Sequence, residues 1–279
     1  MEVLYEDNHI IIVNKAPGEI VQADKTGDTP LSAIVAAWLK EKYAKPGNVF
    51  VGVAHRLDRP VGGVVVFAKT SKALARLNEM FRNGDVHKRY WAITRGTPAT
   101  AEGELTHYIT STERNNKSHA HLSPRPGAKE ARLRYRTIAE GERYRLLEVE
   151  LLTGRKHQIR VQLSAIGCPI RGDLKYGDRR SNPDGSISLL ARSVDFVHPV
   201  SGKHIHVEAD SDFSGEGAPA GILVTRSVPG LKNCSVISLP FTSVFMPPGI
   251  SSTCWAATCG MQSAIASAQA TNRFLMLLR

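Results

Sequence analysis

The stretch AHRLDRPVGGVVVFAKT, residues 54–70, places a charged cluster directly before an apolar run. Its one carboxylate, Asp58, lies between two arginines. Pro60 and the pair Gly62-Gly63 predict a turn, and the run 64–67 predicts a buried strand because it is short, apolar and β-branched. Cationic neighbours favour the ionised form of such a carboxylate, which could then act as a nucleophile or base. The alternative is a surface ion pair that caps the turn, and this stretch alone leaves both open.

Strands and helices are predicted to alternate irregularly on both sides of this stretch. Apolar or alternating runs predict strands at 9–13, 86–94, 131–138, 144–152, 187–197 and 203–209. Apolar stripes of helical period predict helices that begin at Thr29-Pro30 and at Ser71, and a third over 155–166. Residues 111–130 are polar and broken by prolines and a glycine, so we expect a basic loop there.

The composition favours a polyanionic partner. The 279 residues carry a formal net charge of +10, and the isoelectric point is about 9.6. Such a balance suits a nucleic acid, although a protein can also simply be basic. The arginines at 132, 134 and 136 alternate onto one strand face, which would suit either a phosphate backbone or plain solvent.

Several other classes of protein are not indicated. No apolar run approaches the roughly 20 residues of a membrane span, and the acidic N-terminus does not resemble a signal peptide, so we expect a cytoplasmic protein. The four cysteines form no CxxC pair, which argues against a zinc site and a disulfide framework. His119 and His121 have no third ligand nearby in the sequence, so we expect no metal.

Five segments in order resemble the RluA-type pseudouridine synthases. They are YEDNHIIIVNK (5–15), the HRLD stretch, KRYWA (88–92), TGRKHQIRV (153–161), and GCPIRGD with YG (167–177). The resemblance covers roughly residues 1–210 and includes no N-terminal S4 domain. It implies an α+β catalytic fold, with a mixed, mostly antiparallel sheet, flanking helices and a central RNA-binding cleft.

The resemblance also implies the roles of individual residues. Asp58 would be the nucleophile, Tyr90 would lie against the target base, and Arg160 would pair with Asp58. The expected RNA-binding residues are His55, Arg56, Arg59, Arg155 and His157. The expected substrate is ribosomal or transfer RNA, with no cofactor, no metal and a monomeric enzyme. Taken without the family, Tyr90 could be an ordinary strand aromatic and Arg160 a surface arginine.

Two other functions are compatible with parts of the sequence. One is a non-catalytic RNA-binding protein on the same fold, which the presence of Asp58, Tyr90 and Arg160 disfavours. The other is a glycoside hydrolase, which usually needs two paired carboxylates. Only Asp58 lies in a recognisable motif, so the isomerase is the preferred hypothesis.

The composition changes near residue 212. From Phe213 to Arg279 the charged residues are only Glu216, Arg226, Lys232, Arg273 and Arg279. We therefore predict a catalytic domain over 1–212 and an atypical tail over 213–279. The tail is expected to be disordered or non-native, such as an out-of-frame extension, and the alternative is a genuine accessory segment.

Overall fold

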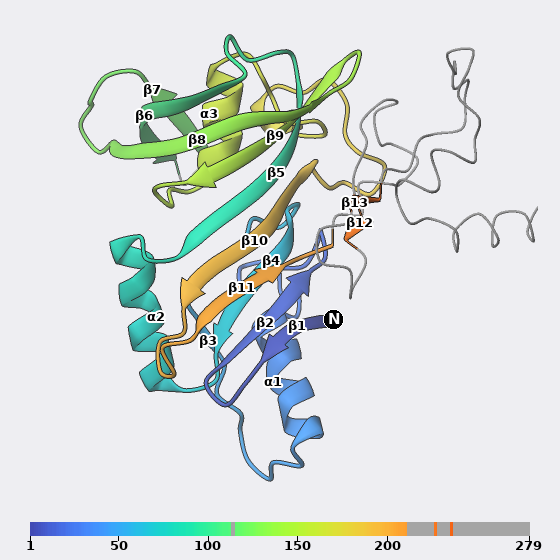
Figure 1. Ribbon diagram of the computed structural model, residues 1–279, viewed down its shortest axis with the longest axis vertical. Helices are drawn as coiled ribbons and strands as arrows, with labels where there is room; N and C mark the ends of the chain where they lie inside the picture. The colour runs from blue at the N-terminus through green and yellow to red at the C-terminus, as the bar shows by residue number, and fades with distance from the viewer. Residues whose placement is uncertain (113–114, 211–225, 228–234, 237–279) are drawn as a thin grey trace, which may run out of the picture. The chain divides into compact units, whose positions relative to one another are not determined.

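An 11-stranded mixed sheet forms the centre of the computed structural model, which describes residues 1–112, 115–210, 226–227 and 235–236 (Figure 1). All of them belong to the unit Met1–Ser238. The strands run β1-β2-β4-β10-β5-β9-β8-β6-β7, with β3 paired to β4 and β11 paired to β10. Among the described strands only β4 and β10 pair in parallel, which confirms the predicted mostly antiparallel α+β class.

The bounds of the strands follow the apolar and alternating runs of the sequence. They are β1 Glu2–Glu6, β2 Ile10–Lys15, β3 Gly52–Val53, β4 Gly62–Ala68, β5 His87–Arg95, β6 Glu102–Thr112, β7 Lys117–His121, β8 Lys129–Glu140, β9 Tyr144–Leu151, β10 Leu189–Val197 and β11 His204–Glu208. The helices are α1 Leu31–Lys42, α2 Ser71–Asn83 and α3 Gln158–Ala165, with a short 3-10 turn η1 at Leu174–Tyr176.

Strands β2 and β4 are buried on both faces because a helix covers each face. Ile11 and Phe67 pack in one core cluster with α1, and Ile12 and Val66 pack in another with α2. Successive side chains point to opposite faces of a strand, so a continuous apolar run serves both clusters. The segment that follows Asp58 is thereby anchored in the middle of the core.

The predicted turn is confirmed at Pro60, where the amide of Val61 donates to the carbonyl oxygen of Asp58 at 3.0 Å. Its extension over Gly62-Gly63 is wrong, because both glycines are already part of β4. Gly63 has φ +112°, and a Cβ there would lie 2.3 Å from the carbonyl oxygen of Ala191 on β10. Gly63 therefore permits the close parallel approach of β4 and β10. The sequence shows only that glycine has conformational freedom. It does not show that strand β10 passes beside these residues.

Two predicted boundaries are also corrected. The expected loop 111–130 contains the end of β6, the whole of β7 and the start of β8. The expected helix 155–166 begins only at Gln158, because His157 before it has φ 54° in the left-handed region. The helix at 29–30 begins one residue later, at Leu31, whereas α2 begins at Ser71 and ends at Gly84 as predicted.

The predicted basic face of β8 is exposed, but its arginines form ion pairs with neighbouring strands. Arg132 and Arg134 both pair with Glu104, at 2.5 and 3.1 Å, and Arg136 pairs with Glu148 at 3.0 Å. Cross-strand partners thus neutralise much of this arginine row.

The predicted tail lies mostly outside the described residues. Of 213–279 the structure describes only β12, Arg226–Ser227, and β13, Ser235–Val236, which pair antiparallel. Within the described part of the chain, none of the helices is both long and apolar enough to cross a membrane.

Candidate active site

A cleft of about 1050 Å³ lies between the loop that carries Asp58, the end of α2, strand β5 and the segment that leads into α3. All of the predicted catalytic and RNA-binding residues line it, namely His55, Arg56, Asp58, Arg59, Tyr90, Arg155, His157 and Arg160. These residues come from three separate parts of the chain. Folding therefore brings together what the sequence shows only as scattered motifs.

The centre of the cleft is an ion pair between Asp58 and Arg160. Nη1 of Arg160 donates to Oδ2 of Asp58 at 2.8 Å. The guanidinium is almost entirely buried on α3, whereas the Asp58 side chain is 28% exposed. Oδ1 of Asp58 accepts no hydrogen bond from any residue that the structure describes. The geometry thus orients the carboxylate through one oxygen and leaves the other without a hydrogen-bond partner among the described residues.

Asp173 holds the other side of the same guanidinium. Its carboxylate accepts hydrogen bonds from Nε and Nη2 of Arg160, at 2.6 and 2.9 Å. Burial disfavours the charge of Arg160, but the hydrogen bonds and charges of Asp173 and Asp58 outweigh burial and raise its pKa above the usual range. Two-point recognition fixes the plane of the guanidinium, so Asp173 determines where the remaining N–H points.

Lys15 secures the loop on which Asp58 lies. Its ammonium, on a side chain only 1% exposed, donates to the carbonyl oxygens of Arg59 at 3.1 Å and Val61 at 2.7 Å. Burial lowers the pKa of Lys15 to about 8, although the charge of Asp58 acts in the opposite direction. The loop conformation beside Asp58 therefore depends on a residue more than 40 positions earlier in the chain.

Tyr90 enters the cleft from β5, between its partner strands β9 and β10. The ring is buried, and burial together with the charge of Asp58 raises the pKa of its hydroxyl. The phenol is therefore neutral at physiological pH. Its position on a central strand is rigid, which suits a surface against which a flat base could be held.

His157 lies beside Asp58 in an uncommon backbone conformation. Its Nε2 is 3.7 Å from Oδ2 of Asp58, and its Nδ1 is 2.7 Å from the hydroxyl oxygen of Tyr176. Burial is the main cause that lowers the pKa of His157 to about 4. A non-glycine residue at positive φ is uncommon, and here that conformation turns the imidazole toward the carboxylate.

The other predicted RNA-binding residues differ in their surroundings. His55 accepts a hydrogen bond at Nε2 from the amide of Val66 at 3.0 Å, and burial lowers its pKa to about 3. One side of this ring is therefore committed to the β4 backbone. Arg56 is exposed, and Arg59 pairs with Asp28 at 2.8 Å on the surface. Arg155 donates to the carbonyl oxygen of Glu130 at 2.8 Å.

Sequence reasoning assigned no role to Lys15, Asp173 or Tyr176, which the structure places around Asp58. All three belong to segments that carry the family resemblance, but nothing in their spacing relates them to Asp58. One feature of the sequence could have identified such residues, namely a polar residue in an otherwise apolar element. Lys15 at the end of β2 is an example. Within the described residues, no group of three or more His, Cys, Asp or Glu side chains could hold a metal.

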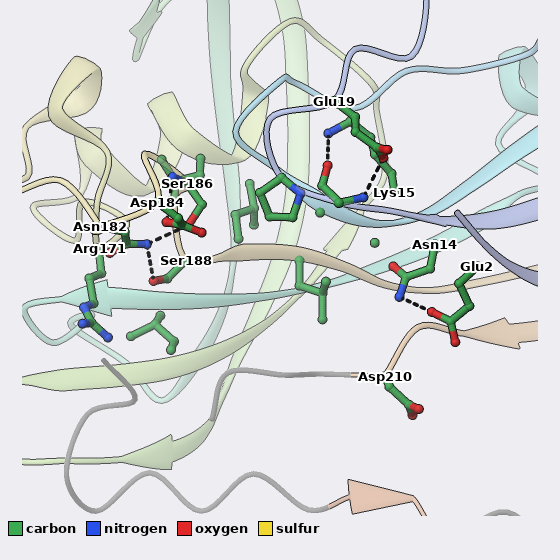
Figure 2. A pocket seen from close by; sticks show the side chains of 18 of the residues that line it. Glu2, Asn14, Lys15, Glu19, Arg171, Asn182, Asp184, Ser186, Ser188 and Asp210 are labelled. Carbon is green, nitrogen blue, oxygen red and sulfur yellow. Dashed lines mark hydrogen bonds between the residues drawn. The ribbon is translucent and has the colours of Figure 1, made fainter. Parts of the chain in front are cut away.

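A second cavity of about 680 Å³ lies where β2, β4 and β10 meet the loop before β10 (Figure 2). Several of its polar side chains bond to one another. Asn14 donates to Glu2 at 2.8 Å, and Asn182 donates to the hydroxyls of Ser186 and Ser188 at 3.2 and 3.3 Å. It has no counterpart of the Asp58–Arg160 pair among its described lining residues, so we assign the chemistry to the cleft.

Comparison with known proteins identifies the class. The family model for RNA pseudouridylate synthase matches residues 9–165. The chain is 31% identical over 220 residues to ribosomal large subunit pseudouridine synthase D of Zymomonas mobilis, covering 75% of this chain and 69% of that one. It is 31% identical to tRNA pseudouridine synthase C of Salmonella typhi, covering 76% of this chain and 86% of that protein.

A solved structure agrees in fold. Human RNA pseudouridylate synthase domain containing 4 superposes with a TM-score of 0.64 at 24% identity, over 76% of this chain and 89% of that one. This chain belongs to the RNA pseudouridylate synthase family, and the resemblance to its RluA-type members is confirmed. It is therefore an isomerase that converts uridine in RNA to pseudouridine.

Proposed function

We propose that Asp58 is the nucleophile of this pseudouridine synthase, with Arg160 as its ion-pair partner and Tyr90 against the target base. The observation that carries the proposal is the Asp58–Arg160 contact of 2.8 Å, which engages one carboxylate oxygen only. An arginine suits this role because it stays protonated and grips carboxylates in a defined plane. Asp58 is thus paired with a permanent cation and oriented by it, and Oδ1 is the oxygen available for attack.

The reaction assigns a task to each of these groups. The N1–C1′ bond of uridine breaks, the detached uracil turns, and C5 bonds to C1′ while the C5 hydrogen leaves to solvent. Asp58 would form the covalent bond to the substrate, at either the ribose or the base. The Tyr90 ring would hold the uracil while it turns. The target nucleotide must leave the base stack, at a cost of a few kcal/mol that contacts in the cleft would offset.

We infer that the substrate is ribosomal or transfer RNA. Two of the relatives are named as ribosomal large subunit and tRNA pseudouridine synthases, and the formal net charge of +10 suits a phosphate backbone. Arg56, Arg59, Arg155 and His157 would contact the RNA around the flipped nucleotide. We further propose that the chain acts as a monomer and that its reaction needs no added cofactor.

Release of tritium from RNA labelled at uracil C5 tests this proposal. The wild-type chain should release one tritium per modified site in buffer that contains a chelator, and Asp58→Asn should release none. RNA affinity of Asp58→Asn should stay within a few-fold of wild type, because phosphate contacts supply most of the affinity. Free uracil in the products would indicate a hydrolase instead, and binding without release would indicate a non-catalytic RNA-binding protein.

A further inference from the structure

The hydroxyl of Tyr176 determines which nitrogen of His157 carries the proton. The Tyr176 oxygen accepts a hydrogen bond from the backbone N–H of Ser118 at 2.8 Å and lies 2.7 Å from Nδ1 of His157. A phenol has one proton to donate, and Nδ1 of His157 lies closer to the hydroxyl oxygen than the Ser118 amide does. When the hydroxyl donates to Nδ1, the proton of a neutral imidazole is on Nε2.

The other end of the ring favours the same tautomer. Nε2 of His157 faces Oδ2 of Asp58 at 3.7 Å, and a lone pair there would oppose the negative carboxylate, whereas an N–H is attracted to it. The distance exceeds that of a hydrogen bond, but catalytic contacts are often long without substrate and tighten when it binds. Both ends of the ring therefore select Nε2–H.

Ser118 on β7 also holds His157 in place. The Ser118 side chain donates to the carbonyl oxygen of Lys156 at 2.9 Å and so holds the residue before His157. His157 itself has φ 54°, a conformation that costs energy in a non-glycine residue and concentrates at functional sites. One serine thus fixes both the hydroxyl that holds the imidazole and the backbone that carries it.

We propose that His157 is a positioning residue for Asp58, which presents a fixed, uncharged N–H donor to Oδ2, and that Tyr176 holds it in that tautomer. Together with Arg160 it directs the carboxylate so that Oδ1 faces the substrate. An uncharged donor is needed because an imidazolium beside Arg160 would place a second cation on the same oxygen and could protonate the nucleophile. The inference rests on the proposed role of Asp58.

The charges around His157 are consistent with a neutral ring. Burial and three cations keep its pKa low, and Asp58 acts in the opposite direction. The cations that face it are Lys156, Arg160 and Lys175, and Lys117 lies over the Tyr176 ring. The Tyr176→Phe variant keeps the aromatic ring beside the guanidinium of Arg160, but Nδ1 of His157 loses its hydrogen-bond donor. Burial and the cations remain in this variant, so the pKa of His157 should rise only part of the way toward the ordinary value of about 6.5, and the proton is no longer confined to Nε2.

The experiment combines nitrogen NMR of the full-length, histidine-labelled chain with single-turnover tritium release against pH. His157 in the wild type should show a neutral ring with the proton on Nε2 from pH 8 to pH 5, assigned by its loss in His157→Gln. Tyr176→Phe should show a neutral ring whose proton is shared between the two nitrogens and which begins to titrate at a higher pH than the wild-type ring. Its rate should begin to fall at that higher pH.

Two variants of His157 separate a donor from mere packing. His157→Gln keeps an N–H near Nε2 and should retain more activity than His157→Leu, which should lose about 10- to 100-fold in rate with unchanged RNA affinity. His204→Leu, at an exposed imidazole on β11 outside the cleft, is the control and should leave the rate unchanged.

The inference and the proposed nucleophile fail in distinguishable ways. A wild-type His157 that titrates near pH 6.5, or that carries its proton on Nδ1, would overturn the inference while Asp58→Asn could still be inactive. An active Asp58→Asn would overturn the nucleophile even if NMR showed the locked tautomer. Equal rates in His157→Gln and His157→Leu would also overturn the positioning role.

Discussion

Asp173 grips Arg160 with both carboxylate oxygens, at 2.6 and 2.9 Å, from a position only 1% exposed to solvent. Of the five N–H groups of the guanidinium, this leaves three, and one of those on Nη1 donates to Asp58. The arginine is therefore shared unequally between two carboxylates. Asp173, which is buried, fixes the plane of the guanidinium. Asp58, which is partly exposed, is oriented through one oxygen only.

Replacing Asp173 with asparagine should slow the reaction more than it weakens RNA binding. The amide offers one acceptor oxygen, so Arg160 is free to turn toward Asp58, and we expect a loss of about 10- to 100-fold in single-turnover rate. Asp178→Asn is the matched control, since Asp178 is a buried carboxylate in the same segment that pairs with Arg95 at 2.9 Å. Both variants should lose stability, but at a temperature where both are folded only Asp173→Asn should be slow. Equal rates would contradict the role of Asp173.

Two substitutions at Arg160 separate its charge from its shape. Arg160→Lys keeps the charge but loses the fork that contacts Asp58 and Asp173 together, so we expect partial activity. Arg160→Met loses both and should lose nearly all tritium release, because it also leaves Asp173 buried without its partner. Circular dichroism checks that each variant is folded. Near-normal rates in both would show that Arg160 is not the partner of Asp58.

Gly63→Ala should unfold more easily than Gly18→Ala. Both glycines have positive φ, +112° and +91°, but a Cβ at Gly63 meets the Ala191 backbone at 2.3 Å whereas nothing lies within 4 Å of Gly18. An alanine at positive φ should lower the free energy of unfolding of each variant by about 1–2 kcal/mol. Only Gly63→Ala should lose further stability, because its Cβ clashes with the Ala191 backbone. Urea denaturation measures the difference. Equal losses would mean that β4 and β10 can separate without cost.

The free energy of unfolding should decrease as the pH falls from about 6.5 toward 4. His55 and His157 have pKa values of about 3 and about 4 in the folded protein, below the ordinary value of about 6.5. In this window the unfolded chain binds protons that the folded chain does not, so each histidine contributes a slope of up to about 1.4 kcal/mol per pH unit.

Urea titrations across this window should show a shallower slope in His55→Gln than in wild type. His204→Gln, at an exposed imidazole of β11, should retain the wild-type slope. A His55→Gln slope equal to that of wild type would show that His55 becomes protonated in the folded protein.

Deletion of residues 213–279 should leave melting temperature and tritium release unchanged. The proposal rests on the sequence, in which charge and periodicity change near residue 212 and the family resemblance ends. Calorimetry of the full chain and of 1–212 provides the comparison. A shortened chain that unfolds at a lower temperature would show that the tail contributes to the folded domain.

The sequence by itself determined the family, the α+β class and the residues around which the site is built. Asp58, Tyr90 and Arg160 were identifiable because each lies in a short contiguous motif, and the buried strands because apolar periodicity is a local property. The burial of β4 and the capping of α2 by Gly84 followed from the same local signals.

Only the tertiary structure decided how Asp58 is held. Lys15, Asp173 and Tyr176 reach the site from elements far apart in sequence, and pairing across such distances leaves no periodic trace in the chain. The same reason explains why Gly62-Gly63 was predicted as a turn and β7 as a loop. Both depend on neighbouring strands, β10 and β6, whose close approach supplies the hydrogen bonds that local propensity does not encode.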